Sequence, residues 1–433
     1  MTTSRLALPL ATRGALALVL MLVAAPAGLA AQPRSVDVFD EHVMPLATRR
    51  LPRIEGREGL EATGLPPFRG ITVGPIESSQ QANRGYGTEA SAALLDHLVR
   101  MGVTWISITP FGRIWSLNST DIYMDFEAPY EANREAMGRM IEQAHERGIR
   151  VLVIPHLWVW NEQGWRGEID FPDEAGWRAY QASYRAFVRA WARDAERFGA
   201  DAFSVGVECK SWSGRFGAYW SSLIDEVRHD FGGWLTYSAN WDEAENVLFW
   251  DQLDFIGVNA FYPLADHNDA TTLEYLEGAE RIRAQVSSLT EVLDMPLLFV
   301  EVGYTTRANA AVEPWLWPDG MTDVVYSEEE QSRALDASFR AFAPERFFAG
   351  FFLWRYYANL DDVSQEAMWG FSTHGKLAEP MLVRSFAAEW GSDATGLERI
   401  SALFEGREIP SEPTPSAVAL RRTSSFWQDT VLE

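Results

Sequence analysis

The chain has 433 residues, 47% of them hydrophobic, and a formal net charge of −24 at pH 7. This length permits one large domain or two to three smaller ones. The acidic balance argues against nucleic acids and anionic membrane surfaces as partners, because both recruit basic patches, and it favours an uncharged or cationic substrate. The 18 Trp exceed what a core needs; ordinary packing accounts for most of them, but surplus Trp in an enzyme often lines grooves for ring-shaped ligands.

The first residues read as an export signal. Arg5 and Arg13 provide a basic start, and the apolar run 15–25 is too short to span a bilayer comfortably. Small residues then offer a cleavage site near Ala30. We therefore expect residues 1–31 to be a signal peptide and the protein to be secreted or periplasmic, with an uncleaved anchor as the alternative.

Residues 32–66 mix charge, Gly and Pro, and we expect an N-terminal extension that packs loosely before the main fold. From residue 67, continuous apolar runs alternate with segments of helical periodicity. Strands are predicted at 68–73, 103–108, 150–154, 201–208, 234–238, 255–259, 297–300 and 349–354. Helices are predicted at 90–100, 131–147, 175–198, 215–231, 243–250, 272–293, 328–342 and 381–390.

Strict alternation of buried strands with helices predicts a parallel sheet with crossover helices. Eight such units across residues 67–390 match a single (β/α)8 barrel, the TIM barrel. An open doubly wound sheet is the alternative, but no Gly-rich phosphate-binding turn follows the first strand, where Val73-Gly-Pro-Ile-Glu77 stands. Residues 391–433 form a C-terminal tail that we expect to drape over the barrel or to be disordered.

In such a barrel the chemistry gathers where the strands end and the following loops begin. Two of the predicted strands end on a glutamate, Glu208 and Glu301. The other strand ends carry mainly aromatic, Asn and His side chains: His156, Trp158, Trp160, Asn240, Trp241, Asn259, Tyr262 and Trp354. Aromatic faces stack on the apolar faces of sugar rings, and Asn, His and carboxylates bond hydroxyl groups.

Other chemistries find little support at these positions. The 7 His show no H-x-H or H-E-x-x-H spacing, so we expect no metal site, and a metal-dependent amidohydrolase barrel is disfavoured. No G-x-S-x-G elbow, no basic cluster for a phosphate and no cofactor motif is present. Two carboxyl groups facing each other across an aromatic-lined cleft remain, and these suit cleavage of a glycosidic bond.

The reaction sets a different requirement for each carboxyl group. One must be protonated to help the leaving oxygen depart, and the other must be ionised to meet the positive charge at the anomeric carbon. A separation of about 5 Å would make the enzyme retaining, through a covalent glycosyl intermediate. For a single Glu at the end of a strand, an ion pair is the simpler explanation. Two such Glu residues at these strands favour a catalytic role.

The placing of Glu208 after the fourth strand and Glu301 after the seventh resembles clan A, the retaining (β/α)8 glycoside hydrolases. Within the clan, the runs 203–208 (FSVGVE), 299–304 (FVEVGY) and 350–354 (GFFLW) are most similar to glycoside hydrolase family 113. The characterised members of that family include β-1,4-mannanases. The resemblance implies that Glu208 is the acid/base and Glu301 the nucleophile.

The resemblance covers residues 68–390 and implies further roles. Tyr262 would lie beside the nucleophile and hydrogen-bond it, and Trp354 would form the platform under the sugar at the cleavage point. The subsites would be lined by His156, Trp158, Asn240 and Trp241. His156 could instead be a structural loop residue, and only one of Trp158 and Trp160 is expected to face the cleft.

One position departs from the clan pattern. Many members carry Asn directly before the acid/base, where it bonds the sugar 2-hydroxyl, but here the residue is Val207. That bond must come from elsewhere, such as Asn240 or Asn259, or be absent, so the choice between gluco- and manno-configured sugars stays open. We expect Cys209 to be a small buried filler and Lys210 to point away from the acid/base.

The sequence therefore predicts an exported, monomeric, retaining β-glycoside hydrolase that needs no cofactor and cleaves a mannan-like polysaccharide or oligosaccharide by double displacement. A clan relative with a different sugar specificity is one alternative. A barrel that binds carbohydrate without cleaving it is the other; Val207 keeps it open, although such a barrel would usually have lost one of the two Glu. The loop 305–326, with Trp315 and Trp317, is expected to wall the cleft.

Overall fold

The computed structural model describes residues 51, 53–57, 59–60, 63–65, 67–74, 83–125, 128–161, 164–318, 321–362, 364–388 and 390. All of them belong to the second of the two units into which the chain divides, Met1–Met44 and Pro45–Glu433. The expected signal peptide and C-terminal tail therefore lie outside the described residues, as does most of the expected N-terminal extension.

The described strands are β1 (Phe68–Gly74), β2 (Trp105–Ile108), β3 (Phe111–Ile114), β4 (Arg150–Val153), β5 (His156–Val159), β6 (Ala202–Val207), β7 (Trp234–Asn240), β8 (Ile256–Asn259), β9 (Leu297–Val302) and β10 (Phe348–Tyr357). The α-helices are α1 (Glu89–Met101), α2 (Tyr130–His145), α3 (Glu174–Phe198), α4 (Lys210–Ser213), α5 (Gly217–Asp230), α6 (Thr272–Leu293), α7 (Glu328–Phe342) and α8 (Ala378–Ala387). Short 3₁₀ helices are η2 (Arg166–Glu168), η3 (Ala244–Asn246) and η4 (Trp250–Gln252).

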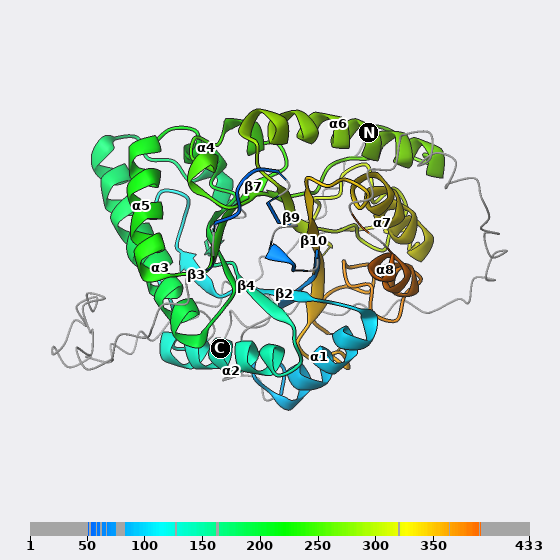
Figure 1. Cartoon of the computed structure of the whole chain (residues 1–433), viewed down its shortest axis with the longest axis horizontal. Coiled ribbons are helices and arrows are strands. Elements are labelled where there is room, and N and C mark those ends of the chain that lie inside the picture. Colours follow the sequence, from blue (N-terminus) through cyan, green and yellow to red (C-terminus); the bar gives the residue numbers. More distant parts are fainter. Residues whose placement is uncertain are drawn as a thin grey trace, which may run out of the picture. The chain divides into compact units, whose positions relative to one another are not determined.

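Eight of the strands close into a parallel barrel in the order β1-β10-β9-β8-β7-β6-β4-β2 (Figure 1). This order follows the chain, so each crossover joins neighbouring strands, and the predicted (β/α)8 barrel is confirmed. β3 and β5 pair separately as a two-stranded parallel sheet. They continue the chain from the carboxyl ends of β2 and β4, so the segment His156–Val159, expected to be a loop, is a short strand at the mouth of the barrel.

The inside of the barrel is filled by large apolar side chains. Phe68 and Trp105 stack with ring centroids 4.2 Å apart, and Phe255 meets Phe68 edge-on at 5.2 Å. Ile54 from the expected extension is buried in the same cluster, and the Leu51 N–H donates to the Gly232 carbonyl at 2.8 Å. The described part of residues 32–66 is thus packed against the barrel core rather than loose.

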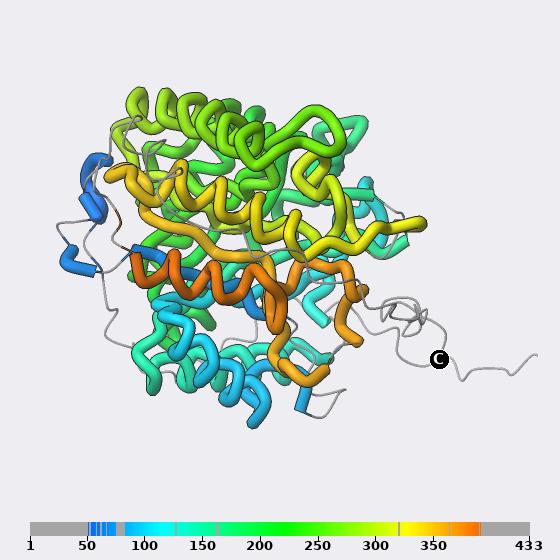
Figure 2. The backbone as a smooth tube through the Cα atoms, turned by 90° about the vertical axis from the view of Figure 1, so that its right-hand side faces the viewer, coloured from blue at the N-terminus to red at the C-terminus, as the bar shows by residue number. Residues whose placement is uncertain are grey.

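The helices surround the barrel, and α6, α7, α8 and α1 follow one another side by side around it (Figure 2). Local chemistry sets their ends. The Thr88 hydroxyl accepts the Ser91 N–H at the start of α1, and Gly102 ends it in the left-handed region at φ +85°. Among the described residues, no helix is long and apolar enough to cross a membrane.

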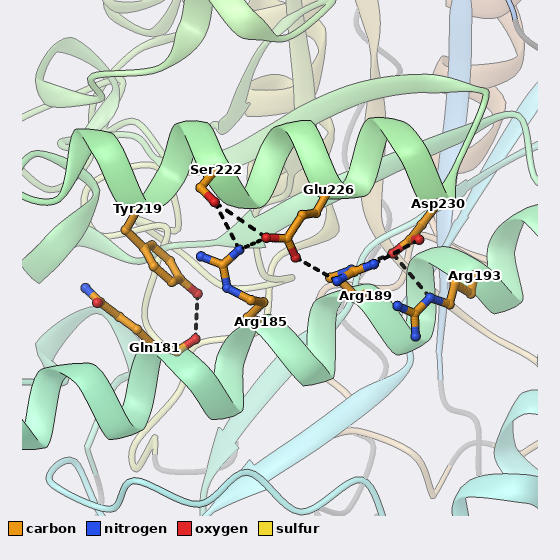
Figure 3. A network of polar contacts seen from close by, with 8 residues as sticks. All are labelled: Gln181, Arg185, Arg189, Arg193, Tyr219, Ser222, Glu226 and Asp230. Atoms are coloured by element: carbon orange, nitrogen blue, oxygen red, sulfur yellow. Dashed lines mark hydrogen bonds and ion pairs between the residues drawn. The ribbon is translucent and has the colours of Figure 1, made fainter. Parts of the chain in front are cut away.

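An ion-pair network joins the outer faces of α3 and α5 (Figure 3). Glu226 accepts from Arg185 and, at 2.7 Å, from Arg189. Asp230 pairs with Arg189 at 2.6 Å and with Arg193 at 3.3 Å. Isolated surface pairs contribute little to stability, but a linked network over two helices fixes their relative register.

The predicted helix 243–250 is wrong. The segment forms only the short turns η3 and η4, and Val247 between them is extended, with φ −69° and ψ 128°. The Glu243 side chain turns into the protein, where it accepts hydrogen bonds from Tyr237 and from the Asn240 N–H.

Candidate active site

Two glutamates emerge from strands at the carboxyl end of the barrel. Glu208 directly follows β6, and Glu301 lies within β9. Both are buried, with 8% and 4% of their surface exposed. Glu208 has φ +49°, a left-handed conformation that costs a non-Gly residue roughly 1–2 kcal/mol. Backbone strain of this kind concentrates at functional sites because the surrounding contacts hold one side chain in one direction.

Asn259 acts on both carboxyl groups. It ends β8, pairs in register with Glu301 on β9, and is fully buried. Its Nδ2 donates to Glu208 Oε1 at 3.0 Å, and its amide acts to lower the pKa of Glu301. One amide therefore fixes Glu208 and acts on Glu301 at the mouth of the barrel.

The charges around Glu301 act in opposite directions. Burial, followed by the negative charge of Glu208, raises the pKa of Glu301 well above its usual value, while Arg166, Arg355 and the Asn259 bond act to lower it. A carboxyl group shifted in this direction keeps its proton to higher pH than a free glutamic acid does.

The loop before η2 supplies two further contacts that the sequence did not predict. Trp165 Nε1 donates to Glu208 Oε2 at 2.7 Å, and the Arg166 guanidinium lies 3.7 Å from the same oxygen. Gly167 makes room for the indole, because a Cβ there would lie 2.3 Å from the Trp165 ring. Lys210 pairs with Asp242 at 2.5 Å, and its ammonium lies 5.9 Å from the Trp165 ring.

His156 faces the second carboxyl group from β5. Its Nε2 lies 3.3 Å from Glu301 Oε1, yet neither atom has a hydrogen-bond partner among the described residues. Burial, with the charges of Arg166 and Arg355, lowers the pKa of His156 well below its usual value, so the imidazole is neutral. A neutral ring that can donate or accept, placed against an unpartnered carboxyl oxygen, is suited to bonding a ligand hydroxyl.

Trp354 and Arg355 form the wall on the β10 side. The Trp354 ring lies parallel to His156, with centroids 5.9 Å apart and a 4° angle between planes. The Arg355 guanidinium lies 5.0 Å from the Trp354 ring and 5.1 Å from the Trp317 ring, and it donates to the Tyr357 hydroxyl at 2.8 Å. Trp317 belongs to the loop that was expected to wall the cleft.

Tyr262 does not make the predicted bond to Glu301: among the contacts of the described residues there is no hydrogen bond between the two side chains. Its ring packs instead against Trp241 at 5.7 Å and Phe299 at 6.4 Å. Trp241 in turn stacks on Trp315, with centroids 5.4 Å apart. Trp315 is 43% exposed, so these rings form an aromatic surface that reaches solvent.

The remaining predicted subsite residues lie at the same end of the barrel. Asn240 ends β7 in register with Asn259, but its Nδ2 donates to Asp242 at 2.7 Å. Trp158 is half-buried on β5, where it pairs with Arg113. The Arg113 guanidinium lies 4.8 Å from the Trp160 ring. Among the described contacts, the Asn240 side chain has no hydrogen bond to either carboxyl group.

A separate group in the described part of the chain has atoms that could hold a metal ion. The group consists of His97 on α1, His374 before α8, and Glu379 on α8. Their ligand atoms lie within 4.8 Å of one another. Glu379 Oε1 lies 2.5 Å from His97 Nε2 and 3.3 Å from His374 Nδ1, and it accepts from Tyr356 at 3.3 Å. These atoms already satisfy one another, and the group fastens the last helix of the barrel to the first.

Comparison with known proteins identifies the family of the chain. The model described as Glycoside Hydrolase Family 113 matches residues 78–376. A family 113 β-mannanase from Alicyclobacillus acidocaldarius, solved in complex with ManMIm, is 26% identical, with a TM-score of 0.63 over 75% of this chain and 98% of its own. A further family 113 β-1,4-mannanase is 23% identical, with a TM-score of 0.64 over 75% and 100% of the two chains. A search of curated proteins gives no match.

Proposed function

The chain belongs to glycoside hydrolase family 113, and from this premise we propose that it cleaves a β-linked, mannan-like polysaccharide or oligosaccharide with retention of configuration. In this proposal Glu208 is the acid/base and Glu301 the nucleophile. The observation that carries it is the pair of buried carboxyl groups, Glu208 held by Asn259 and Glu301 facing His156 through unpartnered polar atoms beside the Trp354 ring.

The first step forms a bond to the enzyme. The ionised Glu301 attacks the anomeric carbon, the bond to the leaving oxygen breaks, and Glu208 gives its proton to that oxygen. In the second step water attacks the same carbon, Glu208 takes its proton, and Glu301 leaves. Trp165 and Asn259 each donate to one oxygen of Glu208 and so fix its direction during both transfers.

The neighbours of the site have distinct tasks in this scheme. Trp354 lies under the sugar at the cleavage point, and neutral His156 bonds one of its hydroxyls. Val207 is 3% exposed and packs in the apolar cluster inside the barrel, so it offers no bond to the sugar. Asn259 Oδ1 has no partner among the described residues, and we assign it the sugar hydroxyl that an Asn before the acid/base would otherwise hold.

The family suggests the substrate class. The two family 113 structures compared above are β-mannanases, and we propose a mannan-like substrate for this chain on that likeness. A different β-linked sugar is the alternative. We further propose that the protein is exported, because the first 31 residues have the composition of a signal peptide.

Two glutamate variants test the assignment. Glu208→Ala and Glu301→Ala should each abolish release of reducing ends from β-mannan while the far-ultraviolet circular dichroism stays unchanged. Glu301→Gly should be rescued by azide, giving a glycosyl azide of inverted configuration. Full hydrolysis by either Ala variant, or an inverting wild-type enzyme, would contradict the proposal. Wild-type binding without turnover across β-mannans, β-glucans and xylans would indicate a carbohydrate-binding barrel instead.

A further inference from the structure

The backbone turns sharply where β6 ends. Glu208 has φ +49°, Cys209 follows with φ −83° and ψ 41°, and α4 begins at Lys210. The Glu208 N–H still donates to the Ser238 carbonyl of β7, at 2.8 Å. Beyond this bond the strand ladder stops, so the Cys209 N–H needs another acceptor, since a buried N–H without one is costly.

That acceptor is a tyrosine hydroxyl rather than a backbone carbonyl. The Cys209 N–H donates to Tyr237 Oη at 2.7 Å. The same hydroxyl donates to Glu243 Oε1, and Glu243 Oε2 accepts the Asn240 N–H at 2.9 Å. A continuous chain of hydrogen bonds therefore runs from the turn after Glu208 to the turn that ends β7.

The packing of the core does not by itself require this chain of hydrogen bonds. The Tyr237 ring already packs against Phe249 and Trp250, with centroids 5.2 and 5.9 Å away, and a phenyl ring would make the same contacts. Glu243 is 1% exposed, and burial raises its pKa to about 7. Burying a carboxyl group at this depth is unfavourable, so its retention calls for a role beyond packing.

We propose that Tyr237 and Glu243 are positioning residues for Glu208: Glu243 orients the Tyr237 hydroxyl, which holds the Cys209 N–H and thereby the left-handed turn that directs the Glu208 carboxyl group into the site. This inference rests on the proposed role of Glu208 as acid/base. Without the hydroxyl, the strained turn relaxes and the carboxyl group moves from the position where it transfers a proton to the leaving oxygen.

Leaving-group dependence separates this role from a structural one. A natural glycosidic oxygen leaves only with a proton from Glu208, whereas a dinitrophenolate leaves without one. Tyr237→Phe keeps the ring, so it should lower kcat/KM on β-mannan by about 10- to 100-fold, the scale of a misplaced catalytic group. On a 2,4-dinitrophenyl β-glycoside the fall should stay within about 3-fold. Azide should raise kcat on that substrate, because it replaces the water that Glu208 would activate.

Two further variants complete the test. Tyr275→Phe is the matched control: it also removes a buried tyrosine hydroxyl that donates to a glutamate, Glu330, but between α6 and α7, and it should leave the ratio of the two activities unchanged. Glu243→Gln keeps the shape and an oxygen acceptor, and should shift the ratio in the same direction as Tyr237→Phe by a smaller factor. If Tyr237→Phe does not fold, the activity ratio of Glu243→Gln decides whether the positioning role is right.

The outcomes separate the inference from the function on which it rests. A wild-type enzyme without activity on both substrates, or a Glu208→Ala variant without leaving-group dependence, would refute the acid/base assignment. The wild-type enzyme and Glu208→Ala can behave as expected while Tyr237→Phe and Glu243→Gln lower the activities on both substrates by equal factors, or lower neither activity. In that case Glu208 is the acid/base and the positioning role is wrong. A changed ratio in Tyr275→Phe would equally overturn it.

Discussion

Replacing Asn259 by alanine tests the centre of the site. The variant removes the Nδ2 bond to Glu208 Oε1 at 3.0 Å and the amide that acts to lower the pKa of Glu301, and it keeps both glutamates. A hydrogen bond to a charged group contributes about 1.5–3 kcal/mol, and each 1.4 kcal/mol is a factor of ten in rate. We therefore expect kcat/KM on β-mannan to fall by about 10- to 100-fold.

The pH dependence of the same variant has a definite sign. The reaction needs Glu301 ionised, so activity is lost as pH falls through the pKa of Glu301, which burial and the charge of Glu208 hold above its usual value. The Asn259 bond acts to lower this pKa. Removing the bond lets the pKa rise further, and the acid limb of the kcat/KM profile should move to higher pH.

The assay is kcat/KM on a defined β-manno-oligosaccharide across the pH range, for wild type and variant, with circular dichroism to confirm folding. Asn240→Ala is the control: Asn240 lies in register with Asn259 on the next strand, but its amide bonds Asp242. It should leave the acid limb in place even if KM rises. An Asn259→Ala profile with an unmoved or lower acid limb, or with kcat/KM within about 3-fold of wild type, would refute the reasoning.

Two other predictions concern contacts at a distance in sequence from the pair. Trp165→Phe removes the N–H that lies 2.7 Å from Glu208 Oε2, so kcat/KM on β-mannan should fall by about 10-fold, and an unchanged value would show that this donor is dispensable. Glu379 has its pKa lowered to about 2, with bonds from His374, the Gly375 N–H and His97 outweighing burial. Its stabilising contribution is therefore present above the unfolded value of 4.5 and is lost as pH falls from 4.5 towards about 2. At pH 7, Glu379→Gln should lower the free energy of unfolding by about 1 kcal/mol, after discounting for solvent, and lower Tm with it. In calorimetry, the Tm difference between wild type and variant should shrink as pH falls from 4.5 towards about 2. A difference that stays constant would contradict the ion-pair origin.

The barrel could be predicted from sequence because its signals are local. Strands such as 297–300 are continuous apolar runs, helices such as α3 carry an apolar stripe, and glycines such as Gly199 end them in the left-handed region. Closure in chain order then follows from the crossover rule, which brings the ends of β6 and β9 to one face. The two glutamates needed only this topology to be placed together.

What the sequence did not reveal depends on loop paths and side-chain directions. Trp165 is 43 positions from Glu208 and lies far along the segment between β4 and α3, so nothing local marks the indole as a donor to that carboxyl group. The segment 243–250 has helical composition but forms only the short turns η3 and η4. Tyr262 follows the expected strand, yet its ring turns towards Trp241 and Phe299 instead of Glu301.

The structure gives a physical reason for Val207, the residue before the proposed acid/base Glu208. Val207 faces the apolar interior with Leu298 and Val300, so an amide at that position would bury an unpaired polar group unless the sugar reached it. Asn259 lies at the mouth of the barrel, bonds Glu208 through Nδ2 and leaves Oδ1 without a partner among the described residues. A sugar hydroxyl that donates to Oδ1 would fix the orientation of the amide and with it the bond to Glu208. Recognition of the hydroxyl and placement of the proton donor would then depend on one side chain, so a sugar that cannot make this bond should lose kcat as well as affinity.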